Sequence, residues 1–169
     1  LMGYYNPIYR YGVERFAADA ASAGVDGVII VDIPPEEEQE CAPALKTAGV
    51  DLVRLIAPTT PAARIREMTR HASGFLYYVA VKGVTGTGAA NPVQALKAVE
   101  TVRSASTLPV GLGFGIRTPE EAAAFAAFAD AVIVGSSIVR KMDGQCTPVD
   151  VLAYAASLAE AVHSARAKV

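Results

Sequence analysis

Short runs of apolar residues alternate along the chain with longer, alanine-rich amphipathic stretches. A strand-like stub covers residues 1–5, and further apolar runs follow at residues 27–32, 52–57, 75–79, 109–114 and 131–135. Most of these runs are β-branched or aromatic and have no polar face, which is typical of strands buried on both sides in a parallel sheet. The pattern therefore predicts six strands and six main helices in a series of βα units.

The helical stretches carry clear start and stop signals. Four of them open with a capping residue before a proline, at Thr60-Pro61, Asn91-Pro92, Thr118-Pro119 and Thr147-Pro148. Thr118 and Glu121 also fit a capping box. The tetrapeptide Ala-Gly-Val-Asp occurs at residues 23–26 and again at 48–51, with Gly24 and Gly49 at the expected helix ends. This repeat of one helix plus one strand supports a chain of βα units with right-handed crossovers.

Two parallel architectures fit this pattern. With 169 residues the chain suits a single domain, 1–169. An open doubly wound sheet of six strands would fit the length as it stands. A (β/α)8 barrel needs eight strands and about 250 residues. Because the sequence opens inside a strand-like run, we expect the front of a larger domain to precede Leu1.

Composition narrows the class of protein. Hydrophobic residues make up 52% and charged residues 19%, which excludes intrinsic disorder. The net charge is −2 and no block of Lys or Arg occurs, so a nucleic-acid or membrane partner is not expected. Cys41 and Cys146 have no metal or redox spacing and indicate a reducing compartment, so we expect a cytoplasmic protein.

Glycine-rich segments follow the last three long strands, where a parallel α/β domain carries its function. They lie at residues 82–88, 113–116 and 135–137. Glycine lets the backbone approach a ligand closely, and Gly135-Ser136-Ser137 also opens a short helix. Each segment alone could be a tight turn, but together they predict a phosphate site. Neither a P-loop nor a dinucleotide fingerprint is present.

Few side chains are placed for catalysis. Asp32 follows a strand and is either a general acid or base or a cap for a helix that starts near Pro34. Lys82 could form a Schiff base, steady a phosphate or be a solvated loop residue. His71 and His163 are expected on helix surfaces, and Glu36–Glu38 are expected to form an acidic first helical turn.

Taken together, these residues resemble the alpha subunit of tryptophan synthase. The motifs that carry the resemblance are Leu1–Asn6, Val31–Pro34, Gly83–Gly86, Gly113–Ile116 and Gly135-Ser136, and their order agrees along essentially the whole chain. The resemblance implies a (β/α)8 TIM barrel, present here as an incomplete barrel that lacks the first two βα units.

The family cleaves indole-3-glycerol phosphate to indole and glyceraldehyde 3-phosphate in tryptophan biosynthesis. It has no cofactor of its own and works beside a beta subunit that holds pyridoxal phosphate. By resemblance, Gly86, Gly115, Gly135 and Ser136 bind the substrate phosphate. The implied indole pocket comprises Tyr4, Ile29, Ile56, Tyr77, Phe114 and Ile133. Thr85 would lie in a loop that closes over the site, and Asn6 and the region around Pro34 would face the beta subunit.

The family's catalytic glutamate and aspartate are expected upstream of Leu1, so the chain alone is expected to be inactive. The residues before Gly83 also differ from the family, which often carries an arginine where this chain has Val81-Lys82. Two alternatives stay open. One is a non-catalytic phosphate-binding half-barrel or partner-docking subunit, and the other is a Schiff-base aldolase-like barrel that uses Lys82.

Overall fold

The computed structural model of the chain describes residues 1–80, 92–113, 115–143 and 146–166. Its strands are β1 (Met2–Gly3), β2 (Gly27–Ile30), β3 (Asp51–Leu52), β4 (Arg54–Ile56), β5 (Leu76–Val79), β6 (Val110–Gly113) and β7 (Ala131–Ile133). All of the pairings between these strands are parallel, in the orders β1-β2-β3 and β4-β5-β6-β7. The predicted run 52–57 is divided at Val53 into β3 and β4, and the other predicted runs each form one strand.

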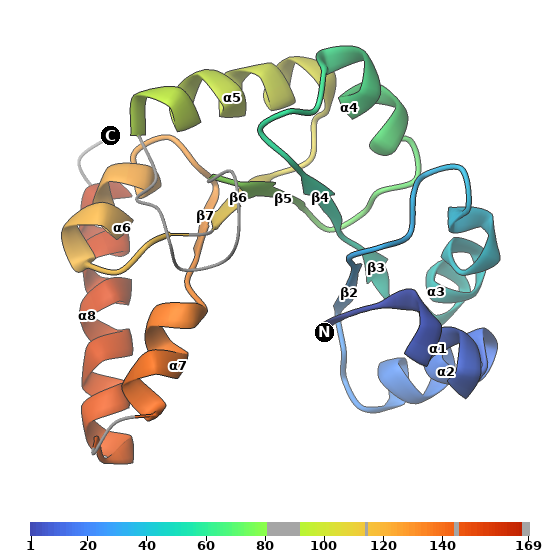
Figure 1. The fold of residues 1–169 in the computed structure, drawn as a ribbon, viewed down its shortest axis with the longest axis horizontal. Helices are drawn as coiled ribbons and strands as arrows, with labels where there is room; N and C mark the ends of the chain where they lie inside the picture. The colour runs from blue at the N-terminus through green and yellow to red at the C-terminus, as the bar shows by residue number, and fades with distance from the viewer. Residues whose placement is uncertain (81–91, 114, 144–145, 167–169) are drawn as a thin grey trace.

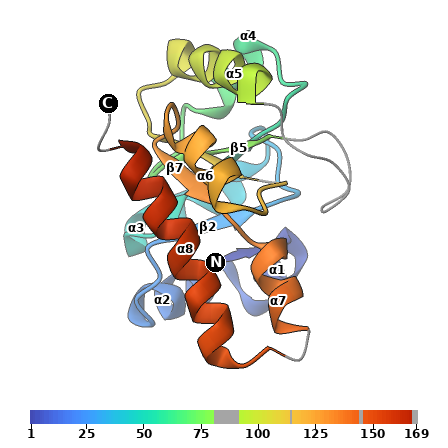
Figure 2. The ribbon, with the colours of Figure 1, turned by 90° about the vertical axis from the view of Figure 1, so that its left-hand side faces the viewer.

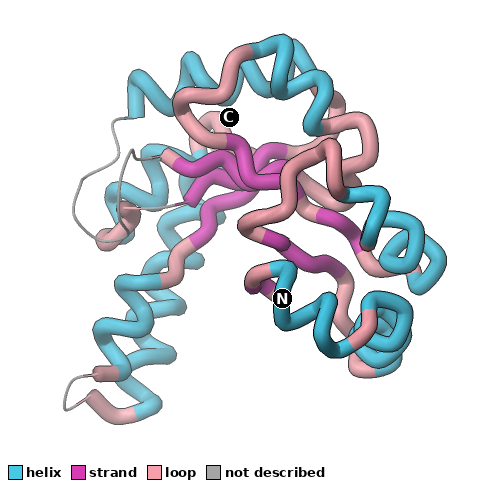
Figure 3. Tube along the Cα trace, turned by 45° about the vertical axis from the view of Figure 1, so that its right-hand side comes forward, coloured by secondary structure: helices cyan, strands magenta, loops and turns pink. Residues whose placement is uncertain are grey.

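Helices follow the strands in the predicted alternation. They are α1 (Tyr5–Tyr11), α2 (Val13–Ser22), α3 (Ala42–Ala48), α4 (Ala62–Met68), α5 (Pro92–Ala105), α6 (Pro119–Ala126), α7 (Ser136–Met142) and α8 (Pro148–Arg166). A short 3-10 helix, η1 (Glu38–Glu40), precedes α3. The strands form a curved row with the main helices on its outer side, so that the fold is an open arch (Figure 1, Figure 3).

The burial pattern explains this curvature. Ile56, Tyr78 and Leu112 are register partners, and all three pack in the cluster that contains residues of α4, α5, α6 and α8. Val28 and Leu52 are likewise partners and pack with α2 and α3. The helices therefore cover one face of the strands, as in a barrel, whereas a doubly wound sheet carries helices on both faces. The α/β class and the barrel-type architecture predicted from the sequence are confirmed.

Two hydrophobic clusters hold the arch together. The larger one joins β4–β7 to α4, α5, α6 and α8, with Leu76, Leu112 and Phe125 fully buried. The helices α6 and α8 pack side by side within it (Figure 2). The smaller cluster joins β2 and β3 to α1, α2 and α3 around Val28 and Leu45. Among the residues that the structure describes, no helix combines the length and apolar character of a membrane span.

Most predicted helix signals act as expected. The capping box of α6 is present, with the Glu121 N–H donating to Thr118 Oγ1 at 3.2 Å and the Thr118 N–H donating to Glu121 Oε2 at 3.3 Å. Gly49 ends α3 in the left-handed region, at φ +74°. At α4 the prediction is wrong, because Pro61 is the N-cap and Thr60 Oγ1 accepts from the Ala57 N–H instead. Asn91 lies outside the described residues.

Candidate functional site

The inner face of the arch is built from the strand residues that point away from the helices. Leu55, Tyr77 and Gly111 are register partners on this face, and Ile133 pairs with Gly113 in the same alternation. A Cβ atom on Gly113 would overlap the Tyr77 ring, and one on Gly111 would lie 2.9 Å from Ile133 Cδ1. These two glycines therefore leave the room that the Tyr77 and Ile133 side chains occupy. Burial raises the pKa of the Tyr77 phenol, which stays neutral at physiological pH.

A cavity of about 220 Å³ opens beside this face, at the carboxyl ends of β6 and β7. Its apolar wall comprises Met2, Tyr77, Ile116, Ile133 and Val134. Its other wall comprises Gly115, Gly135, Ser136 and Ser137. Arg117 and Arg140 complete the lining, and no acidic residue occurs among the described residues that form it. The cavity thus joins an apolar surface to a polar one of glycine and serine, with two arginines in the same lining.

The turn after β6, residues 115–118, forms one part of the cavity wall. It begins with Gly115 at φ +81°, a conformation that favours glycine. Ser137 Oγ donates to the Ile116 carbonyl at 3.0 Å, and the Tyr154 hydroxyl donates to the Arg117 carbonyl at 2.6 Å. The Arg117 N–H donates to Glu121 Oε2 at 2.7 Å. Side chains from α6, α7 and α8 therefore hold this turn.

The start of α7 forms the opposite part of the wall. Gly135 precedes the helix, and its carbonyl accepts from the N–H groups of Ile138 and Val139. The first N–H groups of a helix have no partner within it, and the helix dipole gives this end a partial positive charge. With Ser136, Gly115 and two arginines in the same lining, the arrangement is suited to an anion such as a phosphate ester.

Five residues predicted for the site line this one cavity: Tyr77, Ile133, Gly115, Gly135 and Ser136. Ile29 lies nearby, because it is half-buried and pairs with Met2, which lines the cavity. Tyr4 is 62% exposed between β1 and α1. Lys82, Thr85, Gly86 and Phe114 lie outside the described residues.

Ile56 requires a correction. It is fully buried in the cluster beneath the helices, so it lies on the outer face and not on the face of Tyr77. Side chains alternate along a strand, and this alternation places the neighbouring Leu55 on the inner face. The assignment of Ile56 to the pocket came from the family resemblance and not from the alternation of the strand.

Asp32 caps a different helix from the one predicted. Its Oδ1 accepts from the Tyr5 N–H at 2.7 Å, which satisfies a backbone donor at the start of α1. The partner lies 27 residues earlier in the chain, beyond the reach of a local capping motif. This bond gives Asp32 a structural task at the edge of the arch.

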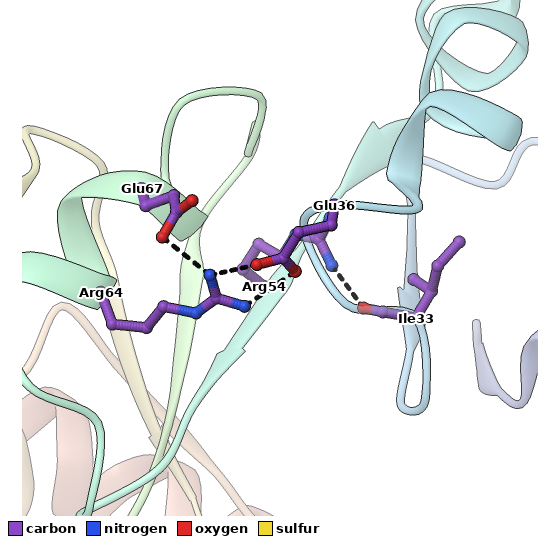
Figure 4. A network of polar contacts seen from close by, with 5 residues as sticks. All are labelled: Ile33, Glu36, Arg54, Arg64 and Glu67. Atoms are coloured by element: carbon purple, nitrogen blue, oxygen red, sulfur yellow. Dashed lines mark hydrogen bonds and ion pairs between the residues drawn. The ribbon is translucent and has the colours of Figure 1, made fainter.

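The expectation of an acidic first helical turn at Glu36–Glu38 holds only for Glu38, which begins the 3-10 helix η1, whereas Glu36 and Glu37 lie before it. Glu38 is 1% exposed and forms an ion pair with Arg54, which is itself 4% exposed and donates to the Ile33 carbonyl at 3.0 Å. Burial lowers the pKa of Arg54. Glu36 instead lies at the surface, and both of its carboxylate oxygens accept from Arg64 (Figure 4). Ion pairs and hydrogen bonds from this segment therefore connect the turn after β2 to β4 and α4.

Other chemistry is sparse. His71 borders a separate groove with Lys46 and Arg70, and His163 is exposed on α8. Cys41 is buried and Cys146 is exposed, and both are free thiols. Within the described ranges, no group of His, Cys, Asp and Glu side chains could hold a metal ion.

Sequence reasoning missed several residues of this site. Ser137 belonged to the Gly-Ser-Ser motif, but nothing in the motif showed that its hydroxyl reaches the Ile116 carbonyl, 21 residues away. Tyr154 had no sequence signal, since it lies 37 residues from its partner on the last helix. Arg117 and Arg140 followed two of the glycine motifs and could have been noted as cations near a phosphate site.

Comparisons with known proteins agree on one family. The family model described as tryptophan synthase alpha chain matches residues 1–165. Tryptophan synthase subunit alpha from Legionella pneumophila has 36% identity over 97% of this chain, with a TM-score of 0.84. The structure of Mycobacterium tuberculosis tryptophan synthase matches at 36% identity over 95% of this chain, with a TM-score of 0.85.

A tryptophan synthase complex from Pyrococcus furiosus matches 95% of this chain at 29% identity, with a TM-score of 0.80. The matches cover 62%, 61% and 65% of the Legionella, Mycobacterium and Pyrococcus chains, respectively. The chain therefore spans less than two thirds of the length of these structures.

Proposed function

The chain belongs to the tryptophan synthase alpha chain family, and from that premise we propose that residues 1–169 bind indole-3-glycerol phosphate. This is the substrate that the family cleaves to indole and glyceraldehyde 3-phosphate. The family is one of lyases in tryptophan biosynthesis, and its alpha subunits need no cofactor, since pyridoxal phosphate belongs to the beta subunit.

One observation carries this proposal: residues that the family resemblance assigns to the phosphate and residues that it assigns to the indole line the same cavity. Gly115, Gly135 and Ser136 form one side of it, while Tyr77 and Ile133 belong to its apolar wall. A phosphate ester of an aromatic compound needs this combination, a polar backbone cradle next to an apolar slot.

In this proposal each part of the substrate has its own residues. The phosphate lies against the backbone of Gly115, Gly135 and Ser136, with Arg117 and Arg140 supplying positive charge. The indole ring lies against Tyr77 and Ile133, with Met2 at the rim. Gly86 and Thr85, which the family resemblance adds to the phosphate site and its closing loop, stay predictions.

We assign these residues to binding and not to proton transfer. Cleavage requires a proton delivered to the indole ring and another removed from the glycerol hydroxyl. The family's catalytic glutamate and aspartate match no residue of this sequence, and Asp32 holds the Tyr5 N–H at the start of α1. Residues 1–169 by themselves are therefore expected to bind the substrate without releasing indole.

A beta subunit is the partner that we propose, in line with the solved complex among the matching structures. Tyr4, Tyr9 and Tyr11 are 62%, 63% and 48% exposed around α1, and Asn6 lies among them. Exposed aromatic side chains of this kind are common in protein interfaces. We propose that this surface and the turn near Pro34 face the beta subunit, in the cytoplasm.

Calorimetric titration of the 169-residue chain with indole-3-glycerol phosphate tests the proposal, with indole release followed in parallel. We expect saturable binding and no indole. Ser136→Asp should abolish binding, because a carboxylate would repel the phosphate while still favouring the start of α7. Ser164→Asp, the same change on the exposed surface of α8, is the matched control and should bind as the natural sequence does.

Two results would contradict the proposal. Equal affinities for Ser136→Asp and the natural sequence would remove the phosphate site from the start of α7. Indole release by the 169-residue chain at a rate typical of an enzyme would contradict the assignment of these residues to binding alone.

A further inference from the structure

Two consecutive carbonyl groups of the turn after β6 accept hydrogen bonds from two different helices. The Ile116 carbonyl accepts from Ser137 Oγ of α7 at 3.0 Å, and Ser137 is only 8% exposed. The Arg117 carbonyl accepts from the Tyr154 hydroxyl of α8 at 2.6 Å. We propose that Ser137 and Tyr154 are positioning residues, which hold this turn in the shape that binds the phosphate. This inference rests on the proposed function.

The bonds act on the peptide groups that follow Gly115. A peptide group is planar, so fixing its oxygen and its N–H fixes its orientation. The group between Ile116 and Arg117 is held at both ends, by Ser137 at the oxygen and by Glu121 at the N–H. Gly115, at φ +81°, thus lies one residue before a peptide group that is fixed at both ends, although glycine by itself is the most conformationally free residue.

Ser137 also links the two sides of the cavity wall. It is the second residue of α7, directly after Ser136, and its hydroxyl reaches the turn that contains Gly115. This buried hydrogen bond therefore connects the Gly115 side to the Gly135-Ser136 side, in addition to the pairing of β6 with β7. A site that is held in its binding shape loses less freedom when the ligand binds, which raises affinity.

Tyr154 of α8 stabilises the same turn. Its hydroxyl holds the turn, and its ring lies under Lys141 of α7, with Nζ 5.6 Å from the ring centroid. The turn, α7 and α8 thus each contact the other two. Neither hydroxyl is charged, so both hold the turn without lowering the positive potential that an anion requires.

Isothermal titration calorimetry with inorganic phosphate, and separately with indole-3-glycerol phosphate, measures how the loss of each hydroxyl changes the affinity. Each variant is studied well below its melting temperature, so that the folded fraction is complete. Ser137→Ala and Tyr154→Phe each remove one hydroxyl and should weaken binding of both ligands about two- to tenfold. Ser137→Thr keeps the hydroxyl and should restore the affinity. The control is Ser104→Ala on α5, which also removes a serine hydroxyl that donates to a backbone carbonyl, that of Thr101 at 2.7 Å, at an exposed position on a helix that does not line the cavity.

A second readout is the amide hydrogen exchange of Gly115 without ligand. It should speed up in Ser137→Ala and Tyr154→Phe but not in Ser104→Ala. If the natural sequence binds both ligands and the two hydroxyl variants bind equally well, the positioning role is overturned and the proposed function stands. If the natural sequence binds neither ligand, both proposals fall.

Discussion

The turns after β2 and after β6 both lie at the carboxyl edge of the arch, yet they are fastened by different chemistry. The turn after β2 is held by charged groups: Asp32 on the Tyr5 N–H, Glu38 on buried Arg54, and Glu36 on Arg64. The turn after β6 is held at its two carbonyls by the uncharged hydroxyls of Ser137 and Tyr154. Glu121 also holds this turn but does not line the cavity.

The difference has a physical reason. A carboxylate that lines an anion site opposes the ligand, so the lining itself should add no negative charge, and Glu121 holds the turn from outside the lining. The turn after β2 has no such restriction, and it uses carboxylates for both buried and exposed contacts. The stability of the two turns should therefore respond differently to pH, salt and the loss of one partner.

The largest effect is expected from breaking the buried pair at the charged turn. Arg54→Leu leaves Glu38 buried without a partner and should lower the free energy of unfolding by ~3–5 kcal/mol. Urea denaturation measures this. The double variant Arg54→Leu/Glu38→Leu should recover most of the loss, since it leaves no unpaired charge. If Arg54→Leu is as stable as the natural sequence, Glu38 and Arg54 do not form a buried ion pair.

A smaller effect is expected at the inner face of the arch, beside the turn after β6. In Gly113→Ala the new methyl group would overlap the Tyr77 ring, and the strain should cost ~1–3 kcal/mol. Tyr77 must move into or away from the cavity, so binding of indole-3-glycerol phosphate should weaken as well. The control is Gly3→Ala in β1, where a Cβ would meet no atom within 4 Å. Thermal melts and ligand titrations of both variants compare their stability and affinity. Equal stability and affinity of Gly113→Ala and Gly3→Ala would refute the overlap.

Loss of the helix cap at the end of the turn after β6 should lower the free energy of unfolding by less again. Thr118→Ala removes the side chain that accepts from the Glu121 N–H, and should destabilise the chain by ~1 kcal/mol. Thr118→Ser keeps the oxygen and should stay close to the natural stability. Chemical denaturation of both variants gives the comparison. An equal loss in both would mean that the methyl group, and not the cap, is responsible.

The smallest effect is expected at the exposed charged contact. Arg64 lowers the pKa of the Glu36 carboxyl to about 2, from an ordinary value of 4.5. A lowered folded-state pKa means that the contribution is complete above pH 4.5 and is lost as the pH falls toward 2. Melting curves across this range should therefore show a slightly weaker pH dependence for Glu36→Gln. High salt should reduce the difference, and an unchanged pH dependence would exclude the contact.

The sequence predicted the parts of the fold that depend on local pattern. The parallel strands, the alternating helices and the Thr118 capping box all follow from hydrophobic periodicity and short-range signals, and the structure has them. The family resemblance assigned Ile56 to the indole pocket, but the alternation of β4 places Ile56 on the outer face and Leu55 on the inner one. Thr60 failed as a cap because its hydroxyl accepts from the Ala57 N–H within its own turn.

Contacts between distant residues were beyond the sequence. Asp32 was expected to be a general acid or base or the cap of a nearby helix but holds the start of α1, and Glu38 was expected in an acidic first helical turn but is buried against Arg54. Neither contact leaves a trace in the local pattern. At the candidate site the backbone elements were predicted from glycine motifs, whereas the hydroxyls that fasten them come from the tertiary fold alone.

The most direct test of the account is a titration of the 15N-labelled chain with inorganic phosphate, followed by the backbone amide resonances. The account predicts saturable shifts at Gly115, Gly135 and Ser136, and little change at the charged turn of residues 31–41. Shifts confined to the groove of Lys46, Arg70 and His71, or none at all, would contradict a phosphate site between the turn after β6 and the start of α7.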